Sequence, residues 1–356
     1  EIWLTSQRSR VVGGLCAQPA AGSRASTSKA RKQAGEAGMF PNVSGAEMRP
    51  GHSKLRILVS GASGLIGSAL VPALRQDGNV VTRLVRRAPG AGEIGWDPEA
   101  GRLNRQELEN FDAVIHLAGE NIGARWTGER RRRIRESRVR GTSLLSEALA
   151  GLRQPPRTLV SVSAVGIYGS RGDEVLTEAS SPGDPSDFLV SVCLDWEAAA
   201  DPARSAGIRV AHPRLGVVLS ARGGALQRLL LPFRLGLGGR VGSGTQWMSW
   251  VAISDAVAAL RHVIATETLA GPINVTTPEP LTNREFTAVL GRVLRRPTVF
   301  PVPAAALRLV FREMADGTLL ASSRVLPERL LKSGYRFQHT GLESALTSLL
   351  YPGRRE

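Results

Sequence analysis

The stretch LRILVSGASGLIG, residues 55–67, constrains the fold more than any other part of the chain. A short apolar run leads directly into glycines at positions 61, 64 and 67, and an apolar helical pattern follows over 65–78. A strand, a glycine-rich turn and a helix in this order open a βαβ unit that binds a dinucleotide. Gly61 permits the tight turn, Gly64 lets the backbone approach a pyrophosphate, and Gly67 allows close packing of helix on strand.

The same turn predicts a phosphate site. A helix N-terminus presents free N–H groups and the positive end of the helix dipole, and both attract an anion. A glycine-rich turn without a ligand is the alternative interpretation. The residues expected to hold the cofactor here are Gly61, Ala62, Ser63, Gly64, Leu65, Ile66 and Gly67.

The end of the second strand indicates which dinucleotide is bound. An acidic residue there would bind a ribose 2′-hydroxyl, whereas an arginine accommodates a 2′-phosphate. Arg86 and Arg87 lie 19 and 20 residues beyond Gly67, and no acidic residue accompanies them. The guanidinium fork pairs well with phosphate oxygens, so NADP(H) is the expected cofactor. Two solvated arginines in an arginine-rich chain are the other interpretation.

The rest of the chain alternates strands and helices. Apolar runs predict strands over 79–87, 111–119, 157–165, 208–219 and 272–277, and helical patterns cover 127–149 and 187–206. This alternation predicts an α/β fold with a doubly wound, Rossmann-like parallel sheet. We expect an NADP-binding domain over 55–220, and a substrate loop with a small C-terminal α/β lobe over 221–356, interleaved with it.

Composition limits the partners and the compartment. The chain is 42% hydrophobic and 22% charged, and it has no run of 18 uncharged apolar residues, so we expect no membrane-spanning helix. Cys16 and Cys193 form neither a disulfide framework nor a metal motif, so no metal is expected and a reducing compartment fits. The net charge of +15 is carried almost entirely by arginine, which indicates coding bias rather than a nucleic-acid partner.

Residues 1–54 look different from the remainder. They are rich in Ala, Gly, Ser and Arg and lack apolar periodicity, so we expect a disordered basic leader or tail. Because the first residue is Glu, Met39 and Met48 are alternative starts. The expected location is the cytoplasm, or an organelle stroma or matrix if residues 1–50 are a transit peptide.

The chain resembles an atypical extended short-chain dehydrogenase/reductase of the NAD-dependent epimerase/dehydratase type. The resemblance covers about residues 55 to 350 and rests on these motifs: GASGLIG (61–67), LVRR (84–87), HLAGENI (116–122), SRVRGT (137–142), SAVGIYGSRGDEVLTE (163–178), DWEAAA (195–200), RLGVVLS (214–220), LLPFRLGLGGRVGSGTQWMSWV (230–251), NVTTPEPLTNREF (274–286) and RVLPERLLKSGYRF (324–337).

The resemblance implies further cofactor contacts. Leu117, Ala118 and Gly119 follow the strand that passes beneath the cofactor ribose, and Arg138 matches the family's Ser-Arg pair on the next helix. The neighbouring arginines of that helix are interpreted as a solvated face.

The resemblance also raises a difficulty. Ordinary members of the superfamily use a Tyr and, four residues later, a Lys that lowers the Tyr pKa and binds the ribose, with a Glu four residues further on. Anchoring on Glu197 places Leu189 at the Tyr position and Cys193 at the Lys position. Neither side chain can perform the proton transfer, and Cys193 has no identifiable His partner as a nucleophile.

Other residues are candidates for the missing chemistry. Ser163 lies at the end of the strand that normally supplies a catalytic Ser, one place early relative to the Tyr-Gly pair, and Tyr168 is the Tyr of that pair. A strand-end cap and a packed Tyr are the equally weighted alternatives. The glycine-rich segment 231–250 carries Arg234, Gln246 and Trp247, which suit a polar or sugar-like substrate, or else pack as a surface loop.

Two functions remain open from the sequence. The first is an NADP(H)-dependent oxidoreductase or epimerase with unusual acid–base residues and an unknown small-molecule substrate. The second is a non-catalytic NADP(H) sensor or scaffold, because plant proteins of this branch are associated with plastid division and the Tyr-Lys pair is missing. The arginine-rich helix over 127–149 should repel a second copy, so a monomer or weak homodimer is expected.

Overall fold

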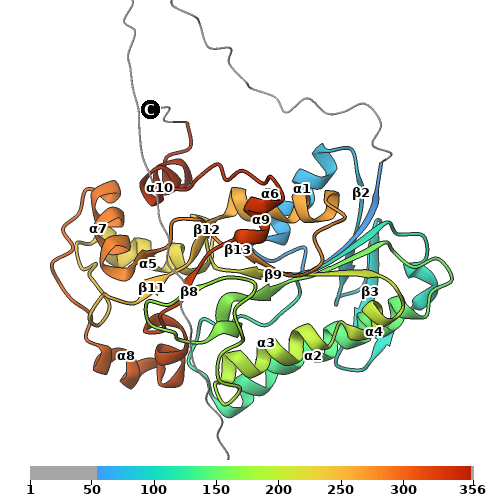
Figure 1. Ribbon diagram of the computed structural model, residues 1–356, viewed down its shortest axis with the longest axis horizontal. Helices are drawn as coiled ribbons and strands as arrows, with labels where there is room; N and C mark the ends of the chain where they lie inside the picture. Colours follow the sequence, from blue (N-terminus) through green and yellow to red (C-terminus); the bar gives the residue numbers. More distant parts are fainter. Residues whose placement is uncertain (1–53, 354–356) are drawn as a thin grey trace, which may run out of the picture. The chain divides into compact units, whose positions relative to one another are not determined.

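A mostly parallel sheet runs through the centre of the computed structural model, which describes residues 54–353 (Figure 1). Its strands follow the order β13-β9-β6-β5-β1-β2-β3-β4, and β7 extends the pairing beside β9. All of these pairings are parallel except that of β3 with β4. The strands are β1 (Arg56–Ser60), β2 (Val80–Val85), β3 (Glu93–Asp97), β4 (Arg102–Leu103), β5 (Ala113–His116), β6 (Thr158–Ser161), β7 (Ser163–Ala164), β9 (Arg209–Leu215) and β13 (Gly271–Val275).

The strand order makes β1 the centre from which the chain winds in both directions. Ile57, Leu58 and Val59 are at most 1% exposed, as expected for a strand with both faces covered. The chain proceeds from β1 to β2 and β3 on one side, then crosses to β5, β6 and β9 on the other. This confirms the predicted doubly wound fold, and it places the topological switch point, where such sheets bind ligands, between β1 and β5.

Helices cover both faces of the sheet (Figure 1). On one face, α1 (Gly67–Gln76) and α6 (Ile253–Ala265) pack on a core that includes Leu70, Leu74 and Leu260. On the other face, α2 (Gly128–Ala150), α3 (Phe188–Ala198) and α4 (Asp201–Ser205) lie together, and a core with Leu145, Leu149 and Ile208 fills the space beneath them.

A separate core lies at one end of the sheet. It is built by α5 (Gly224–Arg234), α7 (Asn283–Leu294), α10 (Leu342–Leu350) and β12 (Trp250–Ala252), around residues that include Leu226, Trp250, Phe286 and Leu346. Helix α6 and strand β13 follow residue 220 in the chain. Strand β13 nevertheless joins the main sheet, and α6 packs on its core. The chain therefore passes between the two cores more than once, and the boundary at residue 220 stays a prediction.

The structure differs from the sequence expectations at two breaks. The strand expected over 208–219 divides at Gly216, where a Cβ would lie 2.5 Å from the Ser249 carbonyl oxygen, so that β10 (Val217–Leu219) leaves the main sheet and pairs with β12. The helix expected over 187–206 divides before α4, which has Pro202 in its first turn. Strands β3 and β4 were not expected, because their residues 93–97 and 102–103 have few apolar side chains.

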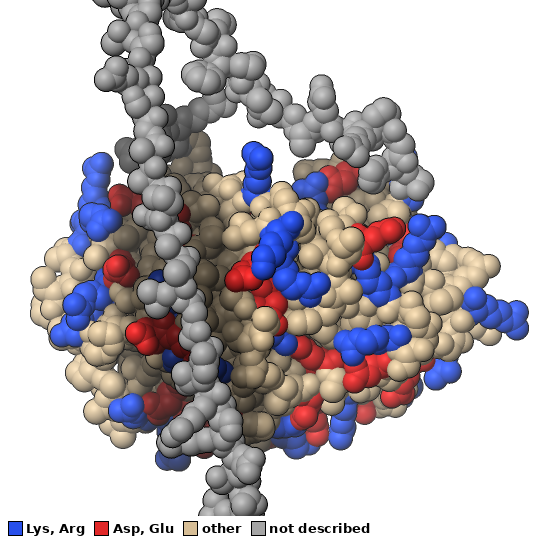
Figure 2. Space-filling view, viewed as in Figure 1, with Lys and Arg blue, Asp and Glu red and all other residues tan. Residues whose placement is uncertain are grey.

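The arginines of α2 are largely compensated within the chain. Arg131 pairs with Glu313, Arg135 with Asp195, and others with glutamates one turn away on the same helix. Figure 2 shows basic and acidic side chains intermixed over the side of the molecule where α2, α3 and α4 lie. Repulsion between copies through this face is therefore weaker than the sequence suggested, and a monomer or weak dimer stays a prediction.

Within residues 54–353, no helix combines the length and apolar character that crossing a bilayer requires. The predicted basic leader, with its alternative start positions and possible transit peptide, lies outside the described residues.

A buried histidine lies at the switch point. His116, at the end of β5, is fully buried, and its Nδ1 shares a 2.7 Å hydrogen bond with the Ser60 hydroxyl at the end of β1. The ring stands edge-on to Trp96, with centroids 5.9 Å apart, and Nε2 has no hydrogen-bond partner among the described residues. Burial lowers the pKa of His116 to about 4, so this side chain is neutral at physiological pH.

We expect His116 to make the fold sensitive to acid. Between pH 6.5 and pH 4 the unfolded chain binds a proton at His116 and the folded chain does not, so the stability falls as the pH falls, by about 3 kcal/mol in all. Urea unfolding at pH 7 and pH 4.5 measures most of this loss. His116→Gln should reduce this pH dependence. It should not abolish it, because burial also lowers the pKa of His212 and that residue still contributes. Equal slopes in both proteins would contradict the assignment.

Candidate functional site

The turn between β1 and α1 is packed as the glycine spacing predicts. Gly61 has φ +67°, and a Cβ on it would lie 2.7 Å from the Leu117 carbonyl carbon. A Cβ on Gly67 would lie 2.3 Å from the Gly61 carbonyl oxygen. Gly61 therefore lets the turn touch the loop after β5, and Gly67 lets α1 begin directly on the turn. Gly64 is exposed, and its N–H donates to the Gly61 carbonyl.

The turn has hydrogen-bond donors to spare. The backbone N–H groups of Ser63, Leu65 and Ile66 donate to no acceptor in the described residues. No side chain caps α1, and its first turn has no acidic residue. Ala62 completes the turn, beneath Gly67. Free donors at a helix N-terminus form a site suited to a phosphate group.

The segment after β5 is fixed against residues 61–67, the candidate phosphate turn. The Leu117 N–H donates to the Ser60 hydroxyl at 3.2 Å and to the Ser60 carbonyl at 3.3 Å. This holds Leu117, Ala118 and Gly119 at the carboxyl edge of the sheet, beside Gly61. The three residues thus lie where the resemblance places the floor of a dinucleotide site.

The two arginines after β2 differ in their surroundings. Arg87 donates to Glu93 at 2.6 Å and to the Ala88 carbonyl, and Arg83 makes a second ion pair with the same carboxylate. The N–H of Gly90 and the Arg87 guanidinium lower the pKa of Glu93, so it stays charged. Arg86 is exposed and has no partner in the described residues. The ion pair with Glu93 therefore engages the Arg87 guanidinium, whereas the Arg86 guanidinium is available to a ligand.

Arg138 reaches the same region from α2. Its guanidinium lies over the Trp196 ring, 4.9 Å from the centroid, and Nη1 donates to the carbonyls of Glu120 and Ile134. A Cβ on Gly119 would be 3.3 Å from the guanidinium carbon. Burial lowers the pKa of Arg138, although an arginine remains protonated in proteins. Arg138 thus touches the segment after β5.

Helix α3 carries packing residues at the two positions where the superfamily has its proton-transfer groups. Asp187 caps the helix by accepting the Leu189 N–H at 2.8 Å. The Leu189 side chain lies against Gly166 and against Gly317, which belongs to a single π-helical turn over Ala315–Leu319. Cys193 is 4% exposed, and burial raises the pKa of its thiol to about 12, so the thiol is neutral. Neither side chain offers a titrating group near neutral pH.

Ser163 and Tyr168 lie in different environments. Ser163, in β7, is 2% exposed, and its hydroxyl makes no hydrogen bond of normal geometry, although it lies close enough to Glu197 to lower the pKa of that carboxyl. Tyr168 is completely buried; its hydroxyl donates to Asn274 at 2.8 Å and accepts from Arg214 at 2.9 Å. Burial raises the pKa of Tyr168. This arrangement favours a packed Tyr over a catalytic one.

An ion pair holds Tyr168 in place. Arg214, at 7% side-chain exposure, donates two hydrogen bonds of 2.9 Å to Glu197 on α3. Burial opposes ionisation of Glu197, but the guanidinium outweighs it and the pKa of Glu197 is lowered. Sequence reasoning used Glu197 only to align α3 and did not identify Arg214 or Asn274. Both residues begin motifs on which the family resemblance rests, RLGVVLS (214–220) and NVTTPEPLTNREF (274–286), but a shared resemblance does not indicate contact.

The three predicted substrate residues do not converge. Arg234 is exposed at the end of α5. Gln246 is buried, and its amide donates to the carbonyls of Val241 and Leu319. Trp247, in β11 (Trp247–Met248), is half-buried beneath the Arg324 guanidinium, 4.2 Å away. The Gln246 side chain therefore connects two backbone segments in this structure.

The glycines of this segment serve packing. A Cβ on Gly238 would lie 2.5 Å from the Phe233 ring, and one on Gly239 would meet the Phe300 carbonyl oxygen. The close approach expected between this backbone and a ligand is thus made with other parts of the chain at these two positions.

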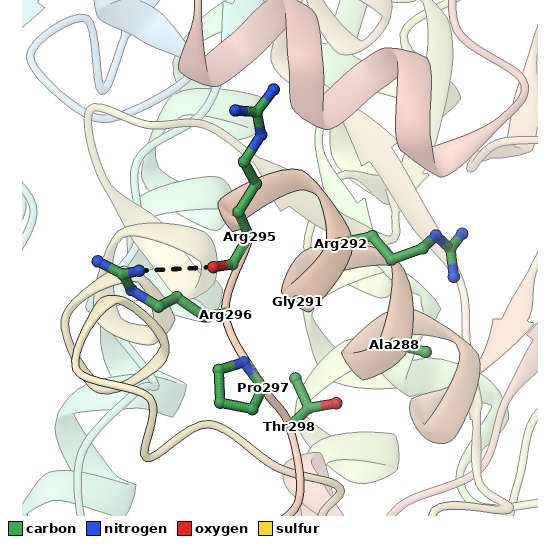
Figure 3. Close-up of a pocket in the computed structure, with 7 residues that line it drawn as sticks. All are labelled: Ala288, Gly291, Arg292, Arg295, Arg296, Pro297 and Thr298. Atoms are coloured by element: carbon green, nitrogen blue, oxygen red, sulfur yellow. Dashed lines mark hydrogen bonds between the residues drawn. The ribbon is translucent and has the colours of Figure 1, made fainter.

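A depression of about 480 Å³ lies near the C-terminus of α7 (Figure 3). It is lined by Ala288, Gly291, Arg292, Arg295, Arg296, Pro297 and Thr298. Figure 3 shows the three arginine side chains pointing away from one another. Arg292 pairs with Glu343, and Arg296 donates to the Arg234 carbonyl. Because the guanidinium groups diverge, the depression is not built around one anion, and it is remote in sequence from the phosphate turn.

A glycine-rich phosphate turn at the switch point of a doubly wound sheet defines a Rossmann-type protein. Comparison with known proteins gives the family. The profile of the NAD dependent epimerase/dehydratase family matches residues 57–275, and a domain of unknown function, DUF1731, matches residues 302–349. The chain belongs to the NAD dependent epimerase/dehydratase family, as the motifs predicted.

Several relatives match over nearly their whole length. Epimerase family protein Mb2239 of Mycobacterium bovis is 44% identical over 292 residues, which cover 82% of this chain and 96% of that protein. The human epimerase family protein SDR39U1 is 38% identical over 300 residues, which cover 83% of this chain and 100% of that protein.

Two solved structures are similar. A crystal structure of human SDR39U1 (isoform 2) with NADPH has a TM-score of 0.76 and 36% identity, covering 84% of this chain and 100% of that chain. A nucleoside-diphosphate sugar epimerase from Corynebacterium glutamicum has a TM-score of 0.70 and 38% identity, covering 84% of this chain and 58% of that chain.

We expect Gly61→Ala to destabilise the protein more than Gly78→Ala. Both glycines have positive φ, +67° and +85°, so an alanine is strained at either position, by about 1–2 kcal/mol. Only at Gly61 does the Cβ meet backbone atoms of Leu117, whereas nothing lies within 4 Å at Gly78. Urea unfolding of both variants isolates the cost of the contact. Equal losses of unfolding free energy would show that β1 and β5 do not depend on it.

Proposed function

We propose that this chain binds NADP(H) at the carboxyl edge of the sheet, with the pyrophosphate on the turn Gly61–Gly67. The observation that carries the proposal is the set of unused N–H donors at Ser63, Leu65 and Ile66, at the start of a helix and at the switch point. The segment Leu117–Gly119 would form the floor beneath the ribose. The NADPH in the human relative's crystal structure supports the choice of ligand.

Arg86 would recognise the 2′-phosphate. It lies directly after β2, is exposed, and has no partner in the described residues. Arg87 lies beside it, and its ion pair with Glu93 fixes the start of the loop. Because Arg83 and Arg87 both neutralise Glu93, this carboxylate does not oppose a phosphate as a free acid would.

We propose that the reaction is an oxidoreductase or epimerase reaction in which the Tyr-Lys pair has no part. NADP(H), when bound, supplies hydride transfer, and the protein's task is to orient it and to exclude water. Ser163 is the candidate donor to a substrate oxygen, because its hydroxyl has no geometric partner and lies at the carboxyl end of a central strand. Trp247 and Arg234 remain candidates for substrate binding, and the substrate is a small molecule of unknown identity.

A second function has its own support. Leu189 is packed against Gly166 and Gly317, Cys193 is neutral, and the Tyr168 hydroxyl is already engaged. A site in which these groups are held in packing interactions is compatible with NADP(H) binding without turnover, as in a redox sensor or a scaffold for a partner.

The cofactor proposal predicts a selective loss in Arg86→Ala. Fluorescence titration should show wild-type protein binding NADPH at least tenfold more tightly than NADH, about 1.4 kcal/mol. Arg86→Ala should weaken NADPH binding by a similar factor and leave NADH binding unchanged. Arg102→Ala, which removes an exposed arginine paired only with Asp97, is the matched control. A loss shared by both nucleotides would assign Arg86 to some other role.

Turnover separates the two functions. With carbonyl compounds and sugar nucleotides as substrates, NADPH oxidation should fall about 100-fold or more in Ser163→Ala at unchanged thermal stability. Tyr168→Phe should instead lower the free energy of unfolding by about 1–3 kcal/mol, because Arg214 and Asn274 lose a buried partner. Tight NADPH binding without turnover of any substrate would favour the sensor.

A further inference from the structure

The lobe at the end of the sheet has an apolar surface that the described residues leave uncovered. Helix α8 (Ala304–Phe311) has the sequence AAALRLVF, yet none of its residues is buried. Large apolar side chains on α8 and on two neighbouring segments are each at least 56% exposed, and these six residues make up the apolar face: Leu235, Leu237, Val299, Phe300, Leu309 and Val310. Exposed apolar side chains gathered in this way mark an interaction site.

Backbone contacts bring the three segments of the apolar face together. Gly239, just beyond Leu237, packs against the Phe300 carbonyl oxygen, and Val241 forms a β-bridge with Val302. Helix α8 begins two residues after this bridge. Figure 1 shows α8, and the chain that joins it to α7, at one end of the molecule, away from α1 and β2. Residues that are far apart in the sequence therefore share one surface.

The charge around the apolar face has a single sign. Residues 231–242 and 295–312 contain six arginines and no acidic residue. Arg308 pairs with Asp316 at 2.9 Å. The other five are exposed and form no ion pair with a described residue: Arg234, Arg240, Arg295, Arg296 and Arg312. The surface therefore complements a partner that is both apolar and anionic.

Two of these arginines occupy strained backbone positions. Arg295 follows the end of α7 and Arg312 follows the end of α8, with φ of +54° and +51°. A glycine adopts such angles without cost, whereas an arginine does not. Among the non-glycine residues that the structure describes, only Asn110 shares a positive φ with them. Strained positions concentrate at functional sites, so these two cations are suited to a role beyond the fold.

Three kinds of partner are to be compared. A second copy of the chain, related by a two-fold axis, would place the same arginines opposite one another. An acidic helix of another protein docks in a groove that encloses its anchors, but here the apolar side chains protrude, and Leu309 is 81% exposed. A bilayer surface needs no complementary shape, because apolar side chains enter between the headgroups while arginines attract anionic lipids. The observations favour the bilayer.

We propose that the apolar face docks on the surface of a membrane that contains anionic phospholipid. Phe300, Leu309 and Val310 enter the interface, and Arg295 and Arg312 lie at the level of the headgroups. The attachment is peripheral, in keeping with the lack of a membrane-spanning helix within residues 54–353. None of the six residues of the apolar face has a part in the proposed NADP(H) site, so the two proposals stand or fall separately.

Co-sedimentation of the full chain with lipid vesicles tests the proposal. Wild-type protein should bind vesicles of equal amounts of phosphatidylcholine and phosphatidylserine, and not vesicles of phosphatidylcholine alone. Added salt should weaken this binding, because it screens the arginines. The double variant Phe300→Gln/Leu309→Gln should bind at least about tenfold more weakly, because two apolar side chains no longer enter the interface. Arg295→Gln and Arg312→Gln should each cost about fivefold.

Matched controls separate the apolar face from the rest of the surface. Leu331→Gln removes an exposed apolar side chain from α9 (Glu328–Lys332), and Arg153→Gln removes an exposed arginine that has no ion pair among the described residues. Both should leave vesicle binding unchanged. All of the substituted side chains are exposed, so the melting temperature should stay that of wild type in every variant.

Several results would overturn the proposal. Wild-type protein that binds neither vesicle would do so, and so would equal binding to both, because the arginines would then have no role. Binding that persists in Phe300→Gln/Leu309→Gln, or that falls equally in the two controls, would lie elsewhere on the chain. If light scattering finds a wild-type dimer that this double variant dissociates, and no vesicle binding, the apolar face is an interface between copies and not a membrane site.

Discussion

The contact between two backbone segments at Gly61 is the constraint on which the candidate site depends. A Cβ at this position would enter the Leu117 backbone, so only glycine lets the turn after β1 meet the loop after β5. The hydrogen bonds from the Leu117 N–H to Ser60 maintain the contact, and the Ser60 hydroxyl also holds His116. The phosphate turn, the segment Leu117–Gly119 and the buried histidine thus form one unit at the switch point, and a change in any of them is expected to move the others.

A second polar unit fixes the neighbouring strands. Glu197, Arg214, Tyr168 and Asn274 connect α3, β9, the turn after β7 and β13 through hydrogen bonds of 2.8–2.9 Å. A buried ion pair of this kind is costly to break, because removal of one partner leaves an unpaired charge in an apolar surrounding. Its presence beside Ser163 means that the groups nearest to the candidate reaction centre are engaged in structure. Ser163 is the exception, since its hydroxyl has no hydrogen-bond partner of normal geometry among the described residues.

These two units limit the chemistry open to the protein. The site has unused backbone donors, an exposed arginine without a partner in the described residues and a fixed guanidinium near α3, and all of these are suited to binding a ligand rather than to proton transfer. It offers no side chain on α3 that titrates near neutral pH, because Leu189 is aliphatic and the pKa of Cys193 is raised to about 12. Any reaction would therefore have to draw its proton from Ser163, from the substrate or from solvent.

The sequence by itself determined the parts of the protein that depend on local order. Apolar runs, helical patterns and the spacing of Gly61, Gly64 and Gly67 predicted the sheet, its winding and the place of the phosphate turn, because these features are encoded by neighbouring residues. Only the tertiary structure decided the state of the long-range partners. Arg87 and Arg86 look identical in the sequence, yet Glu93 occupies one and leaves the other free. In the sequence Tyr168 is a candidate for the missing proton-transfer chemistry, but Arg214 and Asn274, far away in the chain, meet it in a fully buried core. Burial and pairing arise from which strands become neighbours, and no local pattern records that.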